Sequence, residues 1–73
     1  MEYLEIIKSI GFKIKVLRMK NNLTQSQLAA LIDANEKYIG KVESGKQNIT
    51  IRTLSKILIA LNIEFEDFIN MKL

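Results

Sequence analysis

The chain lacks the residues on which most enzyme and metal sites depend. Its 73 residues include no cysteine and no histidine, which excludes disulfides and thiolate metal sites and removes the commonest general base and metal ligand. No other residue set supplies a nucleophile, a base and an orienting group together. We therefore expect no catalytic activity, no metal and no cofactor. Among the three function classes considered for this chain, an enzyme is the least favoured.

Proline is also absent, and only 7% of the residues are aromatic. No stretch approaches the roughly 18 apolar residues of a membrane span. The amino terminus alternates charged and apolar residues, unlike a secretory signal. We therefore expect a cytoplasmic protein without a membrane partner. An apolar fraction of 48% suffices for one efficient core, which predicts a single domain over residues 1–73.

Positive charge gathers in the middle of the chain. Residues 8–63 contain ten of the eleven cations and three of the eight acids, a net charge of +7, whereas residues 1–7 and 64–73 each carry −2. A basic centre with acidic ends suits a domain that meets phosphates on one side and another partner on the other. An ordinary solvated surface is the alternative interpretation of the same balance.

Residues 24–45 contain two short helix patterns joined by a tight turn. Thr24 and Gln27 fit a capping box, which predicts a helix start. Asn35 can cap a second helix, and Gly45 can end it in the left-handed conformation. Helices joined by so short a turn cross steeply and need a small residue at the crossing. The apolar residues of the two inner faces are Leu28, Ala29, Ile32, Ile39 and Val42.

Apolar periodicity over the whole chain predicts five helices and no strand, which is an all-α fold class. The first helix runs from about residue 4 or 9 to residue 20, and the sequence leaves its start open. The second and third are the two segments within residues 24–45. The fifth spans residue 65 to about residue 71. The fourth follows a Thr50 cap, and its apolar face consists of Ile51, Leu54, Ile57, Leu58 and Leu61.

The order of these residues resembles the helix-turn-helix regulators of the lambda repressor, Cro and Xre type. The family's pattern is present here as Gln25, Leu28-Ala29, Ile39, Val42 and Glu43-Ser44-Gly45. The resemblance runs from about residue 10 to residue 68 and implies a compact five-helix, lambda-repressor-like DNA-binding domain. The short length, the Asp33 turn and the Tyr38-Ile39 pair look most like the controller proteins of restriction-modification systems.

A few positions depart from the family's pattern. Asn22 and Asp33 stand where glycine is common, and because these residue types tolerate positive φ, we expect both turns to survive. Glu64 replaces the customary serine cap of the fifth helix. Gly40 lies inside the third helix, where it costs about 1 kcal/mol relative to alanine. It either lets the backbone approach DNA closely or is simply tolerated.

The first turn of the third helix can read bases, since Asn pairs with adenine, Glu accepts from cytosine and Lys donates to guanine. The resemblance implies that Gln25 clamps the DNA backbone and supports the recognition helix, with capping alone as the alternative. Tyr38 either lies on a sugar or covers the edge of the core. The candidate DNA contacts are Gln25, Ser26, Asn35, Glu36, Lys37, Tyr38, Lys41, Lys46, Asn48 and Arg52.

Two further groups have structural roles in this interpretation. The resemblance implies a partly buried ion pair between Arg18 and Glu43 that joins the first helix to the third. Because four helices already fill the core, the last helix is expected to form a dimer interface. The alternative is that its phenylalanines close the core of the monomer. The dimerisation segment covers about residues 64–73, and its contacts are Phe65, Phe68, Ile69 and Leu73.

Together these features predict a sequence-specific DNA-binding transcriptional regulator, an autoregulatory controller or a phage-type repressor. A homodimer on an inverted-repeat operator doubles an interface that one small domain cannot make large. The expected partners are double-stranded DNA and a second copy of the chain, with RNA polymerase as a further partner to test. The rival class is an antitoxin that binds a toxin protein and autoregulates, for which only residues 1–8 are free. Neither the operator nor the sign of regulation follows from the sequence.

Overall fold

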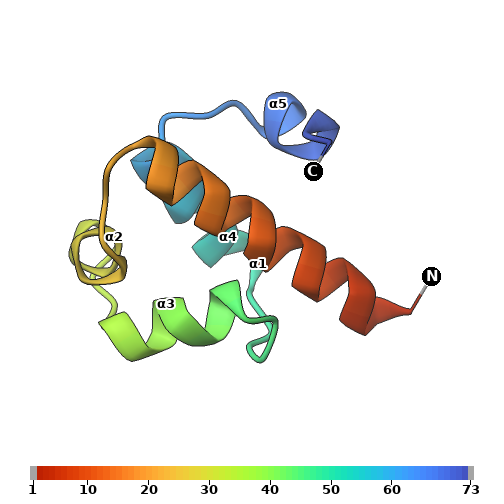
Figure 1. The fold of residues 1–73 in the computed structure, drawn as a ribbon, viewed down its shortest axis with the longest axis horizontal. Helices are drawn as coiled ribbons and strands as arrows, with labels where there is room; N and C mark the ends of the chain where they lie inside the picture. The colour runs from red at the N-terminus through yellow and green to blue at the C-terminus, as the bar shows by residue number, and fades with distance from the viewer. Residues whose placement is uncertain (1, 73) are drawn as a thin grey trace.

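Five helices make up the structure, a computed structural model that describes residues 2–72 (Figure 1). They are α1 (Tyr3–Lys20), α2 (Gln25–Leu31), α3 (Glu36–Glu43), α4 (Ile51–Ala60) and α5 (Phe65–Asn70). No strand forms within this range, which confirms the predicted all-α fold class. The long α1 crosses the molecule, with α3 on one side of it and α5 on the other (Figure 1). Within the described residues, no helix combines the length and apolar character that a bilayer crossing requires.

The predicted helix caps are present at α2 and α4. The Thr24 hydroxyl accepts from the Gln27 backbone N–H at 3.0 Å, and the Gln27 carboxamide accepts from the Thr24 N–H at 2.8 Å, which completes the capping box. Thr50 accepts from the Thr53 N–H at 3.0 Å. By contrast, α1 begins after Glu2, whose side chain makes no cap hydrogen bond. The earlier of the two predicted starts of α1 is therefore the better one, although no capping motif marks it.

Left-handed residues make the turns between helices. Asn22 and Asp33 have φ angles of 57° and 56°, so the turns survive without glycine, as predicted. Gly45 ends α3 with φ of 75°. Asn62, between α4 and α5, has φ of 54° and was not predicted. The turn between α2 and α3 is closed by a 2.9 Å hydrogen bond from the Ala34 N–H to the Ala29 carbonyl.

All five helices contribute to one core. Its buried apolar residues are Ile14, Leu17, Leu28, Ala29, Ile32, Ile39, Val42, Leu54, Ile57, Leu58, Leu61 and Phe68. The prediction was wrong at Ile51, which is 77% exposed. Ile51 lies on the same face of α4 as Leu54 and Leu58, but it occupies the first position of the helix. That end of α4 extends beyond the packed interior, so the first apolar residue of the stripe is exposed to solvent.

The fifth helix closes the core through a single residue. Phe68 is 1% exposed, so the structure corrects its assignment as a dimer contact: its ring is a core group of the monomer. The Lys13 ammonium lies 5.6 Å from the centre of that ring and donates to the Ile69 carbonyl at 3.2 Å, which ties α5 to α1. Phe65 and the Ile69 side chain are exposed. Leu73, the fourth predicted contact, lies outside the described residues.

Candidate nucleic-acid interface

Helix α3 presents one apolar and one polar face. Its start is fixed by Asn35, whose side-chain oxygen accepts from the Tyr38 N–H at 2.8 Å. Ile39 and Val42 are buried against the core. The opposite face carries exposed polar and charged residues, namely Glu36, Lys37 and Lys41. The side chains that are predicted to contact DNA are therefore exposed to solvent on this helix.

A buried ion pair anchors the carboxyl end of α3 to α1. Arg18 donates from Nε to Glu43 Oε2 at 2.6 Å and from Nη2 to Glu43 Oε1 at 3.1 Å. The same guanidinium donates from Nη1 to the Leu23 carbonyl at 2.7 Å. The hydrogen bond with Glu43 raises the pKa of Arg18, partly opposed by the desolvation of burial. The ion pair implied by the family resemblance is therefore present, as a bidentate contact.

Gln25 extends this network from α2. Its side-chain Nε2 donates to Glu43 Oε1 at 3.2 Å, so one carboxylate receives hydrogen bonds from both α1 and α2. Gly40 lies beneath the Gln25 carboxamide, because a Cβ built on Gly40 would stand 3.6 Å from Gln25 Oε1. That is ordinary contact, so alanine also fits at Gly40. Gln25 thus supports the third helix in the way the resemblance implied.

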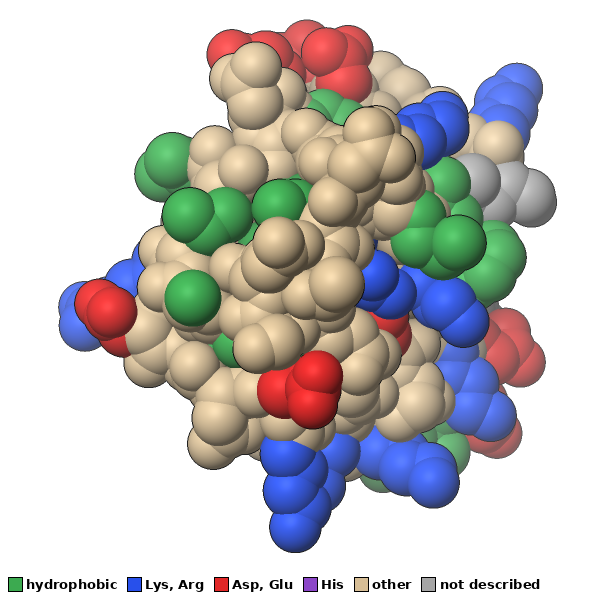
Figure 2. Space-filling model, turned by 60° about the vertical axis from the view of Figure 1, so that its left-hand side comes forward, with side chains coloured by type: hydrophobic (Ala, Val, Ile, Leu, Met, Phe, Trp, Pro, Cys, Tyr) green, Lys and Arg blue, Asp and Glu red, His purple; other side chains and the backbone are tan. Residues whose placement is uncertain are grey.

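The remaining candidate contacts differ in exposure. Tyr38 is half-buried and packs against the core, which favours its role at the core edge. Within residues 2–72 the only ion pair is the one between Arg18 and Glu43, so the exposed lysines of this surface have no acidic partner. Figure 2 shows Lys and Arg side chains gathered along the bottom and lower right of one face, at the height of α3. The exposed candidates are Ser26, Asn35, Glu36, Lys37, Lys41, Lys46, Asn48 and Arg52.

Gly11 contributes to the position of α3 and was not predicted as a site residue. A Cβ built on it would lie 2.2 Å from the Val42 carbonyl oxygen and 3.0 Å from that of Glu43. Only glycine lets α1 approach the end of α3 so closely. The available signal was a glycine inside a strong helix pattern, which often marks a close packing contact.

Helix α3 has an exposed polar face, and buried hydrogen bonds hold it against α1 and α2. This arrangement defines a helix-turn-helix DNA-binding domain. The family model described as helix-turn-helix matches residues 14–68. The chain therefore belongs to the helix-turn-helix family of Xre type, a family of DNA-binding regulators and not of enzymes.

Restriction-modification controller proteins are among its similar proteins. Control protein C.MunI from a Mycoplasma species is 38% identical over 58 residues, which are 78% of each chain. The crystal structure of the controller protein C.AhdI from Aeromonas hydrophila aligns with a TM-score of 0.86 at 28% identity, covering 93% of this chain and 99% of that one. The controller protein C.Esp1396I, solved as a tetramer with its natural 35 base-pair operator, gives a TM-score of 0.83 at 28% identity over 97% and 91% of the chains.

Proposed function

We propose that this chain is a sequence-specific transcriptional regulator that acts in the cytoplasm as a homodimer on an inverted-repeat operator. One observation carries the proposal: the exposed polar face of α3 stands on a helix that the Arg18, Glu43 and Gln25 network holds in place. Relatives that are controller proteins, one of them solved on its operator, support it. They give no support to the antitoxin alternative.

The start of α3 supplies the base-reading side chains in this proposal. Glu36 and Lys37 lie in the first turn, the part of the helix that enters the major groove in this docking mode. Both are exposed and unpaired in the described structure. The Asn35 carboxamide oxygen is already occupied by the Tyr38 N–H, so it is poorly placed for a bidentate contact with adenine. We therefore assign base readout to Glu36 and Lys37 and helix capping to Asn35.

Contacts to the DNA backbone come from the segments that flank α3. Lys46, Asn48 and Arg52 are exposed along the loop into α4 and its first turn. Cations beside the positive amino terminus of α4 oppose its dipole unless an anion lies between them. A phosphate supplies that anion. Ser26 and Lys41 border the same surface and complete the proposed set of phosphate contacts.

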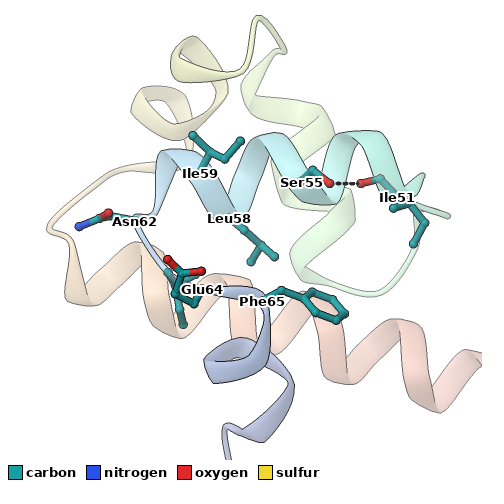
Figure 3. A pocket seen from close by; sticks show the side chains of 8 residues that line it. Ile51, Ser55, Leu58, Ile59, Asn62, Glu64 and Phe65 are labelled. Atoms are coloured by element: carbon teal, nitrogen blue, oxygen red, sulfur yellow. Dashed lines mark hydrogen bonds between the residues drawn. The ribbon is translucent and has the colours of Figure 1, made fainter.

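The second copy of the chain is placed against α4 and α5. A groove of about 570 Å³ between these helices is lined by Leu58, Ile59 and Phe65, among others. Figure 3 shows Leu58 and Phe65 on the sides of this hollow, with Ile51 at its far end. Ile59 is 78% exposed and Phe65 58%, an unusual amount of apolar surface for a small monomer. Because α5 lies across α1 from α3, pairing there leaves α3 free for DNA (Figure 1).

The test begins with duplexes that the wild-type protein selects from a random-sequence library. We predict that Lys37→Ala costs about 1–3 kcal/mol on the selected site and much less on a scrambled duplex. Lys46→Ala should weaken both similarly and reduce the salt slope by about 1. Titration of labelled duplexes at a series of salt concentrations measures the affinity of each variant for each duplex and the salt slope.

Lys20→Ala is the matched control, because Lys20 is exposed at the carboxyl end of α1 and outside the proposed surface. Equal losses on both duplexes for Lys37→Ala would contradict the base-reading assignment. A wild-type protein that enriches no sequence would contradict the proposed function itself. Transcription in vitro from a template with the selected site then tells whether the regulator represses or recruits RNA polymerase.

A further inference from the structure

The amino-terminal half of α1 passes the carboxyl end of α3 at very short range. Gly11 meets the Val42 carbonyl there without room for a side chain. One turn earlier on the same face of α1, Lys8 meets Gly45: a Cβ built on Gly45 would lie 3.1 Å from Lys8 Cα and 2.5 Å from Lys8 Cγ. Each of these two close contacts is possible because one of the residues is glycine. The backbone packing of the two elements therefore fixes where Lys8 stands.

Lys8 adds a cation to a surface that is already positive. Lys46 directly follows Gly45, and its N–H donates to the Lys41 carbonyl at 2.9 Å, so α3 ends between these lysines. Lys8 approaches the same point from α1, and its side chain is exposed. Three segments thus bring lysines to one end of α3.

No acid forms an ion pair with these lysines in the described structure. Glu43, the acid at the end of α3, is buried and satisfied by Arg18 and Gln25. Glu5 precedes Lys8 by one turn of α1 but forms no ion pair with it within residues 2–72. Three unpaired cations repel one another in the free protein, and an anion placed among them removes that repulsion.

We propose that Lys8 contacts a DNA phosphate and that Lys8 and Lys46 form a clamp, one on each side of Gly45, at the carboxyl end of α3. The proposal rests on the proposed function, because it takes α3 to lie in the major groove with its carboxyl end toward the bordering backbone. A lysine ammonium binds phosphate as a point charge and carries no sequence information. The matched family segment begins at residue 14, so Lys8 lies outside it.

Two substitutions separate charge from packing. Lys8→Gln keeps Cβ and Cγ, the part of the side chain that contacts Gly45, but removes the charge, whereas Lys8→Arg keeps the charge. The probe is a labelled mixed-sequence duplex of about 30 base pairs, long enough for a dimer on successive turns. Anisotropy titrations over a range of KCl concentrations give the affinity and its salt dependence. Lys20→Gln is the matched control at an exposed lysine at the carboxyl end of α1.

For Lys8→Gln we expect about a threefold to tenfold loss of affinity, and a salt slope smaller by about 0.9 for each phosphate that is no longer neutralised. The loss should be the same on the selected and the mixed-sequence duplex. Lys8→Arg and Lys20→Gln should keep the wild-type slope, and all variants should melt like the wild type.

Other outcomes distinguish a failure of the Lys8 clamp from a failure of the proposed function. An unchanged slope for Lys8→Gln, beside a reduced slope for Lys46→Ala, overturns the clamp but leaves the proposed function standing. Equal weakening by Lys8→Gln and Lys8→Arg means that the side chain acts through packing, which also overturns it. A wild-type protein without sequence preference overturns the proposed function, while the slopes on the mixed-sequence duplex still decide the role of Lys8.

Discussion

Gly11 and Gly40 both lie inside helices, but only Gly11 is required by its surroundings. A Cβ on Gly11 would overlap the Val42 carbonyl oxygen at 2.2 Å, whereas one on Gly40 would make ordinary contact with Gln25. We predict that Gly11→Ala destabilises by about 1–3 kcal/mol, since α1 must move off the end of α3. Gly40→Ala should be neutral or stabilise by up to about 1 kcal/mol, because alanine favours the helix. Urea unfolding of both variants measures the difference.

The two variants control for each other, because both replace a helical glycine by alanine. Equal effects on stability would contradict the close approach of α1 to α3. DNA titration of Gly40→Ala has a second use, since an unchanged affinity would show that this glycine is simply tolerated in the third helix.

The Arg18 and Glu43 pair is a second prediction at the scale of residues. Glu43→Ala removes the acceptor of both Arg18 and Gln25 and leaves a buried guanidinium, so we expect a loss of about 3–5 kcal/mol. Arg18→Met combined with Glu43→Leu should lose less than the sum of the single changes. Because the hydrogen bond raises the Arg18 pKa, this stabilisation is lost only as the pH rises through the raised arginine value, so it persists in mild alkali.

Unfolding of the wild type, both single variants and the double variant gives the coupling energy. Additive losses would show that the two side chains do not stabilise each other. Gln25→Ala is the useful companion, because it removes one of the two donors to Glu43 Oε1 and should cost less than Glu43→Ala.

At the scale of residues, the sequence could predict helix caps and turn conformations. The Thr24 capping box follows from residue types at short spacing and is present. Left-handed Asn22 and Asp33 were predicted because they tolerate positive φ and stand where the family commonly has glycine, and both are present. The role of Gly11 depends on Val42, which is distant along the chain, and no local pattern contains that contact. The ion pair was accessible only through the family resemblance, for the same reason.

At the scale of elements, Asn35 decides whether the start of α3 is a cap or a base contact. Its carboxamide oxygen accepts from the Tyr38 N–H. We predict that Asn35→Ala costs about 1 kcal/mol of stability and that Asn35→Ser restores it, because serine is also a good cap. The serine variant should keep the wild-type sequence preference. Thermal melting and repeated duplex selection measure the two properties.

A serine variant that melts like the wild type but selects a changed base pair would contradict the capping assignment. In that case the amide itself reads the base. Ser26→Ala serves as a control in the same assay, since Ser26 is exposed on α2 and is assigned no part in base readout.

Helix faces were predictable, but the depth to which each face is buried was not. The stripe on α4 is correct from Leu54 onward, yet Ile51 extends past the core because periodicity does not show where the packed interior ends. In α5, fewer than two turns separate Phe65 from Ile69, too short a segment for periodicity to tell the inner aromatic from the outer one. Tertiary packing selected Phe68 for the core.

At the scale of the whole molecule, most basic side chains lie away from the acidic side chains of α5. In Figure 2 one cluster of acidic side chains lies at the top, at the height of α5, and most basic side chains lie toward the bottom, at the height of α3, with further acidic side chains among them. Because DNA phosphates attract the basic side chains near α3, this distribution favours an approach to DNA with α3 leading. The acidic end is also where the exposed apolar residues of α5 are found. In the proposed arrangement the partner surface and the DNA surface lie on opposite sides of α1 (Figure 1).

That separation leads to the prediction on assembly. Ile59 on α4 and Ile69 on α5 are 78% and 52% exposed, so a charge at either position need not disturb the monomer core. We predict that Ile59→Glu and Ile69→Glu remain helical and melt near the wild-type temperature. Both should sediment as monomers, because a carboxylate buried in an apolar interface without a partner is strongly unfavourable.

The functional consequence separates this interface from a general surface effect. A monomer still places one α3 in one half-site, so both variants should lose much more affinity for the full inverted repeat than for a half-site. Met19→Glu is the matched control, since Met19 is 58% exposed but lies near the end of α1, outside the groove between α4 and α5. If Ile59→Glu and Ile69→Glu both stay dimeric, the interface lies elsewhere, and the exposed face of α4 and α5 needs another partner. If Met19→Glu is also monomeric, added negative charge rather than disrupted apolar packing separates the subunits, and the assignment to α4 and α5 fails.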